Sequence, residues 1–159
     1  MLKAQEVHSK IIDSLRKRGP SLPIQVAKDM SMSSLFVSAF LSELVDDKKV
    51  RVSSLKVGGT PLYYLEGQEE KLENFYKFLH PKEAEAFILL KKNKILKDSE
   101  QEPAIRVALR SIRDFAIGFK KNNEIYWKDF SATESEIESS LESQEITKPE
   151  KRESSRAIE

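Results

Sequence analysis

The chain has 159 residues, enough for one ordinary domain or two very small ones. It contains no cysteine, which excludes disulfides, zinc ribbons and thiol catalysis, and its net charge of +1 excludes a generic polyanion binder. No apolar leader and no run approaching about 18 apolar residues is present, so we expect a cytoplasmic protein without membrane segments.

Three amphipathic helices are predicted in the first third of the chain, over residues 4–18, 22–30 and 33–45. Apolar residues recur in them at helical spacing, and Gly19-Pro20 ends the first helix. The polar stretch between the second and third helices has the length of a turn.

Residues 50–65 predict a β-hairpin. Strand-forming residues flank Gly58 and Gly59, and glycine supplies the positive φ that a tight turn needs. Helix, short turn, helix and hairpin, in that order, predict an α+β fold of the winged helix-turn-helix type.

On this order of elements and on the hairpin Lys56-Val-Gly-Gly-Thr-Pro-Leu-Tyr-Tyr, residues 4–79 resemble the winged-helix DNA-binding regulators of the MarR and ArsR kind. The resemblance implies that the third helix enters the major groove of DNA and that the hairpin, or wing, contacts the backbone or the minor groove. The implied contact residues are Ser33, Ser34, Ser38 and Ser42 on the helix and Arg51, Lys56 and Thr60 in the wing. One departure is that no Lys or Arg lies between Lys28 and Lys48, which suits a helix packed against protein equally well.

A fourth helix is expected from Gly67 to Leu79. Its stripe of Leu72, Phe75, Tyr76 and Leu79 is long enough to pack on an equivalent helix in a homodimer. Intramolecular packing between the two halves of the chain explains the stripe equally well.

The second half repeats the order of the first. Helices are predicted from Pro81 and over Glu100–Asp114, where Ser99 and Glu102 have capping-box spacing, followed by strands at 115–119 and 124–130. Two interpretations of residues 80–130 stay open: a second, reduced winged helix, or a helical and hairpin extension of a first domain formed by residues 1–79.

A basic surface is predicted in this second half. Arg106, Arg110 and Arg113 share one face of a helix, and Lys120 and Lys121 follow in the position of a wing. The alternatives are a solvated helix face, or arginines that pair with nearby carboxylates, for which Glu100, Glu102 and Asp114 are the candidates. Trp127, in an alternating strand, is expected to be partly buried with its N–H bonded.

Residues 131–159 contain 8 acidic and 4 basic residues and few apolar ones, which predicts a disordered acidic tail. The two histidines, His8 and His80, lie far apart, and we expect no catalytic residue, metal site or cofactor. The sequence as a whole predicts a DNA-binding protein, transcription-regulator-like or chromatin-associated. The alternatives are a protein-interaction scaffold built on winged helices within a larger complex, and RNA binding.

Overall fold

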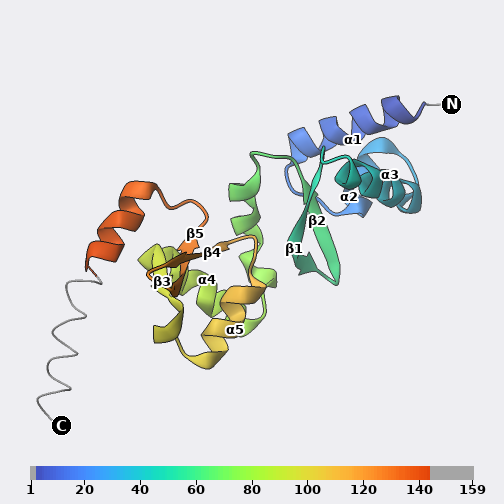
Figure 1. Ribbon diagram of the computed structural model, residues 1–159. Helices are drawn as coiled ribbons and strands as arrows, with labels where there is room; N and C mark the ends of the chain where they lie inside the picture. Colours follow the sequence, from blue (N-terminus) through green and yellow to red (C-terminus); the bar gives the residue numbers. More distant parts are fainter. Residues whose placement is uncertain (1–2, 144–159) are drawn as a thin grey trace, which may run out of the picture. The chain divides into compact units, whose positions relative to one another are not determined.

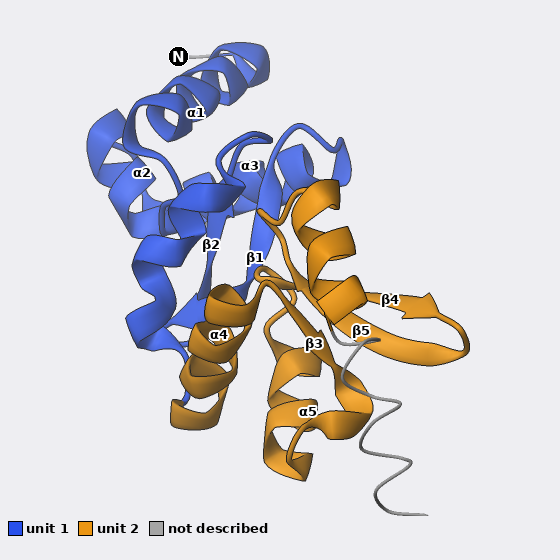
Figure 2. Cartoon of the chain, turned by 90° about the vertical axis from the view of Figure 1, so that its left-hand side faces the viewer, with its two compact units in different colours: residues 1–80 blue, residues 81–159 orange. Residues whose placement is uncertain are grey.

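The computed structural model describes residues 3–143, and the chain divides into two compact units, residues 1–80 and 81–159 (Figures 1 and 2). Each unit has its own apolar core. The core of the first is built from one face of each of its three helices, and the core of the second gathers around Phe115, whose ring contacts that of Phe87 edge-on at 4.8 Å.

The three helices predicted for the first unit are confirmed as α1 (Ala4–Arg18), α2 (Pro23–Met30) and α3 (Ser34–Asp46). Gly19 ends α1 with φ +87°, a conformation that glycine adopts without strain. Ser33 begins α3, because its hydroxyl accepts a hydrogen bond from the Leu35 amide at 3.2 Å.

The predicted hairpin is confirmed as β1 (Arg51–Val57) paired antiparallel with β2 (Thr60–Tyr64), with positive φ at both Gly58 and Gly59. An isolated β-bridge extends it, since Ser21 exchanges two backbone hydrogen bonds with Tyr63, of 2.8 and 2.9 Å. The segment between the first two helices therefore pairs with the last strand, which in turn pairs with the middle one. This order makes the first unit a winged helix.

The fourth helix differs from the prediction. Residues Glu69–Phe78 form a 3-10 helix, η1, rather than an α-helix. With 3.0 residues per turn, the spacing i, i+3, i+4, i+7 no longer describes one face, so the predicted stripe does not form. Leu72 is fully buried, whereas Tyr76 is exposed.

The second unit runs α4 (Pro81–Asn93), β3 (Ile95–Lys97), η2 (Asp98–Glu100), α5 (Pro103–Ser111), β4 (Ala116–Lys121) and β5 (Glu124–Asp129). Its sheet has the order β3-β5-β4, which is the same first, last, middle order as in the first unit. The single 3-10 turn η2 stands where the first unit has α2. The second unit therefore has the winged-helix strand order with one helix reduced to a turn.

Two local predictions in the second unit are wrong. The helix expected over Glu100–Asp114 is shorter and spans Pro103–Ser111. Glu102 lies at its N-cap without a side-chain hydrogen bond, so the predicted capping box with Ser99 does not form. The three-residue strand β3 was not predicted, since it is too short to show an alternating pattern.

The predicted disorder from Ser131 onward does not hold for the described part of that segment. Residues 134–143 form a helix, and Leu141 on it is only 5% exposed. The Thr133 hydroxyl accepts from the Glu136 amide at 3.2 Å at the start of this helix, and Leu141 gives it one buried apolar side chain. The remainder of the predicted tail, residues 144–159, lies outside the described residues. Within residues 3–143, no helix is long and apolar enough to cross a bilayer.

Candidate nucleic-acid interface

The resemblance to regulators implied that the serines of α3 contact DNA, but several of them take part in local hydrogen bonds. Ser33 caps the helix, and the Ser42 hydroxyl donates to the Ser38 carbonyl oxygen at 3.1 Å. Ser34 is exposed and Ser38 is half-buried. These hydroxyls supply weak contacts, and no cation on the helix accompanies them.

The outer face of α3 is apolar and acidic. Leu35 and Phe36 are 77% and 61% exposed at its N-terminal end. Toward its C-terminal end, Glu43 accepts a hydrogen bond from His8 at 3.1 Å, and Asp46 is exposed. A phosphate backbone gains nothing from such a face, because it offers no positive charge to replace the counterions.

The wing of the first unit has a weak cationic character. Lys56 and Thr60 are exposed near the tip of the hairpin, as the resemblance implied. Arg51 lies at its base and forms ion pairs with Glu66 at 3.3 Å and Glu69 at 3.6 Å. The structure therefore leaves one lysine near this tip and does not add Arg51 to it.

The second unit contains a different arrangement, centred on Asp98. This carboxylate is 2% exposed at the start of η2, and both Arg106 and Arg110 of α5 bind it. Trp127 of β5 donates its indole N–H to the same carboxylate at 2.9 Å. Two of the arginines are thus paired with a carboxylate, but the partner is Asp98, which was not among the predicted carboxylates Glu100, Glu102 and Asp114.

Charge and packing fix this arrangement together. Hydrogen bonds from Arg110 in the first place, and from Trp127 and Arg106, hold the pKa of the Asp98 carboxyl well below its usual range despite its burial. The Arg110 guanidinium also lies over the Trp127 ring, 5.4 Å from its centre. Gly118, opposite Trp127 in the sheet, leaves room for the indole, since a Cβ there would lie 3.1 Å from the ring.

The remaining predicted cations lie around this cluster. Arg113 is exposed but follows the end of α5 at Ser111, so it does not continue the helical row of Arg106 and Arg110. Lys120 and Lys121 end β4 beside the turn made by Asn122 and Asn123, both with positive φ. The wing of the second unit is therefore basic at its tip, as predicted.

Asp98 is the functional residue that the sequence did not reveal. It stands eight and twelve positions before its arginines, and no local spacing rule connects it with them. The only local signal is an acidic residue two positions after the apolar pair Ile95-Leu96, which is also a common way for a strand to end. Trp127 behaves as predicted, half-buried with its N–H bonded.

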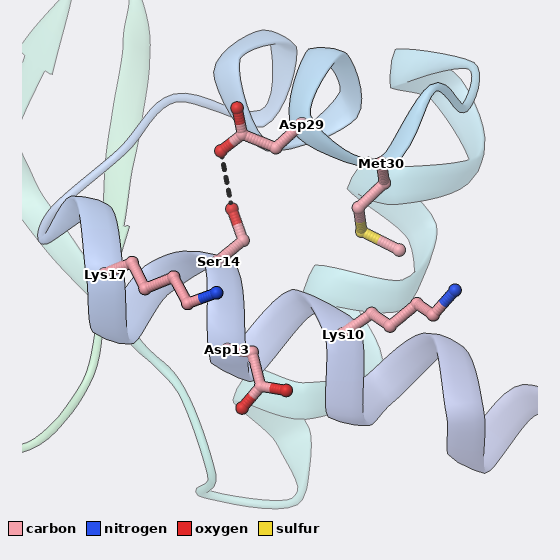
Figure 3. A pocket seen from close by; sticks show the side chains of 6 residues that line it. All are labelled: Lys10, Asp13, Ser14, Lys17, Asp29 and Met30. Carbon is pink, nitrogen blue, oxygen red and sulfur yellow. Dashed lines mark hydrogen bonds between the residues drawn. The ribbon is translucent and has the colours of Figure 1, made fainter.

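A surface cleft of about 600 Å³ lies in the first unit, lined by Lys10, Asp13, Ser14, Lys17, Asp29 and Met30 (Figure 3). Its two carboxylates already have partners. Asp29 binds Ser14 and Arg18, and Asp13 binds Arg16. Among residues 3–143, no group of three or more His, Cys, Asp or Glu side chains is placed to hold a metal ion.

Two of the three comparisons with known proteins find no match. No protein-family model matches the chain, and no curated protein matches it. Among solved structures, the chain is similar to the Zalpha domain from Carassius auratus PKZ, crystallised in complex with Z-DNA. The two are 27% identical, and the similarity covers 39% of this chain and 95% of that one with a TM-score of 0.36. The winged-helix assignment rests on the strand orders described above.

Proposed function

We propose that this protein binds double-stranded DNA through its second unit, with α5 against the major groove and the β4–β5 hairpin as the wing. The observation that carries the proposal is the distribution of charge on the two winged-helix frames. Residues 103–123 of the second unit contain five Lys or Arg and one Asp, and two of the five, Arg106 and Arg110, share the carboxylate of Asp98. Residues 33–47 of the first unit contain three acidic residues and no Lys or Arg. Cations on the groove-facing helix and wing supply the phosphate contacts that dominate affinity for DNA.

On this proposal the protein acts as a transcription-regulator-like or chromatin-associated factor in the cytoplasm, without catalysing a reaction. The predicted contacts of the first unit then become secondary. Lys56 and Thr60 near its wing tip add to the affinity, and the serines of α3 contribute little.

Binding and its salt dependence test the proposal. We expect a fluorescein-labelled duplex of random sequence to bind, with an affinity that falls steeply between 50 and 200 mM salt, roughly as in other proteins with several phosphate contacts. The triple variant Arg113→Ala, Lys120→Ala, Lys121→Ala should flatten the slope of log affinity against log salt by about 2–3 units, because each lost phosphate contact removes about 0.9. These three residues do not bind Asp98, so the variant leaves the Asp98 cluster intact.

A matched control removes the same charge elsewhere. The variant Lys10→Ala, Lys17→Ala, Lys28→Ala also loses three exposed lysines, but from α1 and α2 of the first unit. Its slope should stay close to that of the unmodified protein. Equal slopes for both triple variants would contradict a DNA-binding surface on the second unit.

A second function is favoured by Leu35 and Phe36. Their exposure at the N-terminal end of α3 suits a protein-interaction scaffold, because large apolar side chains grouped on a surface mark contact sites. The double variant Leu35→Asp, Phe36→Asp separates the two functions. If α3 faces protein, DNA affinity stays within about 2-fold, and if α3 enters a groove, the added charges weaken binding strongly. A duplex RNA of the same sequence, measured in parallel, tests the RNA alternative.

A further inference from the structure

The two arginines bound to Asp98 each use only part of their hydrogen-bonding capacity on it. A guanidinium has five N–H donors in a planar fork, arranged so that two different edges can each present a pair of donors. Which edge faces Asp98 therefore decides what the arginine has left to offer.

Arg110 presents the edge formed by Nη1 and Nη2 to Asp98. Its Nη1 donates to Oδ1 at 2.7 Å and its Nη2 to Oδ2 at 3.1 Å, and Nη1 also donates to the Arg106 carbonyl oxygen at 2.8 Å. The edge formed by Nε and the second Nη2 hydrogen has no partner among residues 3–143.

Arg106 presents its other paired edge, formed by Nε and Nη2, to the same carboxylate. Its Nε donates to Oδ2 at 3.0 Å, and its Nη2 lies 2.8 Å from that oxygen. The edge formed by Nη1 and the second Nη2 hydrogen is left over. Both arginine side chains remain 44% exposed, so each keeps solvent-facing surface outside its contacts with Asp98.

We infer that Arg106 and Arg110 read guanines in the major groove, with Asp98 and Trp127 as the positioning residues that hold them. This inference rests on the proposed DNA binding by the second unit. Guanine presents two acceptors, O6 and N7, that match a pair of parallel arginine donors. A fixed arginine with one open two-donor edge fits this target, and its immobilisation before binding lowers the entropy that recognition costs. A phosphate contact needs no such orientation, because a flexible lysine supplies it.

The helix geometry sets the spacing of the bases. Arg106 and Arg110 lie one turn apart on α5, which corresponds to a rise of about 6 Å. Successive bases on one strand are about 3.4 Å apart, so the two guanines should lie within about two base-pair steps of each other.

The test begins with selection of bound duplexes from a random pool at 150 mM salt. Each guanine of the selected site is then replaced in turn by 7-deazaguanine, which removes only the N7 acceptor. We expect about a 10-fold loss of affinity at two positions within two steps of each other and almost none at the others. In Arg110→Lys, which keeps the charge but not the fork, one of the two losses should disappear.

Asp98→Asn tests the positioning role. If Asp98 orients the arginines, the ratio of affinities for the guanine and 7-deazaguanine duplexes should fall toward 1. A merely structural role would lower both affinities and leave the ratio unchanged. Because Asp98→Asn is expected to be less stable, its DNA binding is measured at a temperature where Trp127 fluorescence shows that the variant is folded. The control is Lys120→Ala, which should weaken binding to all duplexes equally.

Two outcomes would overturn the inference, and they differ. If the unmodified protein binds duplexes well but selection enriches no guanine, or 7-deazaguanine has no effect, the arginines contact phosphate and the proposed DNA binding survives alone. If no duplex binds at 50 mM salt, the proposed function itself fails and the guanine reading with it.

Discussion

Replacing Asp98 by Asn should destabilise the second unit while leaving the first unit unchanged. The substitution keeps the shape of the side chain and one acceptor oxygen, but it removes the charge that Arg106 and Arg110 share. It also leaves a buried amide N–H₂ facing two guanidinium groups, which are donors as well.

The magnitude follows from burial and from the exposure of the partners. Hydrogen bonds to charged groups contribute about 1.5–3 kcal/mol each, and breaking a fully buried ion pair costs about 3–5 kcal/mol. Asp98 is 2% exposed, but its arginines are 44% exposed and regain water when the partner is lost, so the loss is smaller. We expect the free energy of unfolding of the second unit to fall by about 2–3 kcal/mol, or its melting temperature by roughly 10–20 °C.

The loss should depend on pH in a definite direction. The pKa of Asp98 is lowered in the folded state, chiefly by Arg110, relative to about 3.9 in the unfolded chain. Its contribution to stability is therefore complete above about pH 4 and disappears as the pH falls through the folded-state pKa. The Asn variant has no such contribution, so its stability should converge with that of the unmodified protein in acid.

The assay uses Trp127, the single tryptophan of the chain, whose fluorescence reports unfolding of the second unit in urea. The control is Glu100→Gln, which removes a negative charge from an exposed side chain of η2. It should change stability by less than about 0.5 kcal/mol, as surface substitutions usually do. A loss below 0.5 kcal/mol in Asp98→Asn at pH 7, or a difference that stays constant from pH 7 to pH 2.5, would refute the reasoning.

Three further predictions concern packing. Leu141→Ala should lower the stability of the second unit by about 2–3 kcal/mol, because the side chain is buried. An unchanged midpoint of urea unfolding would show that residues 134–143 do not pack on this unit. Gly118→Val should cost about 1–3 kcal/mol and shift the Trp127 emission, since a Cβ meets the indole at 3.1 Å, and an unchanged spectrum would contradict the close approach. The homodimer expected through Leu72, Phe75, Tyr76 and Leu79 has lost its stripe in the 3-10 helix, and light scattering tests directly whether any dimer forms. Because Leu72 is buried, Leu72→Ala should destabilise the first unit by about 2–5 kcal/mol and leave the molecular mass in solution unchanged. A dimer of the unmodified protein that dissociates in this variant would instead show that Leu72 contacts a second copy of the chain.

The sequence determined the first unit well, for a local reason. The helical spacing of Val7, Ile11 and Leu15 and the glycine pair at 58–59 act through neighbours in the chain, and α1 and the β1–β2 hairpin form where they predict. The architectural repeat in the second half also followed from the order of its elements. The basic residues at 106, 110, 120 and 121 were recognisable as cations on one helix and one turn.

Only the tertiary structure decided what those cations are attached to. Asp98 meets Arg106, Arg110 and Trp127 because η2, α5 and β5 converge, and such a contact leaves no spacing in the sequence. The helix at 134–143 was likewise invisible to composition, since its order depends on a place for Leu141 to pack. Periodicity records which face of an element is buried, whereas the partner of a buried charge is set by contacts between elements far apart in the chain.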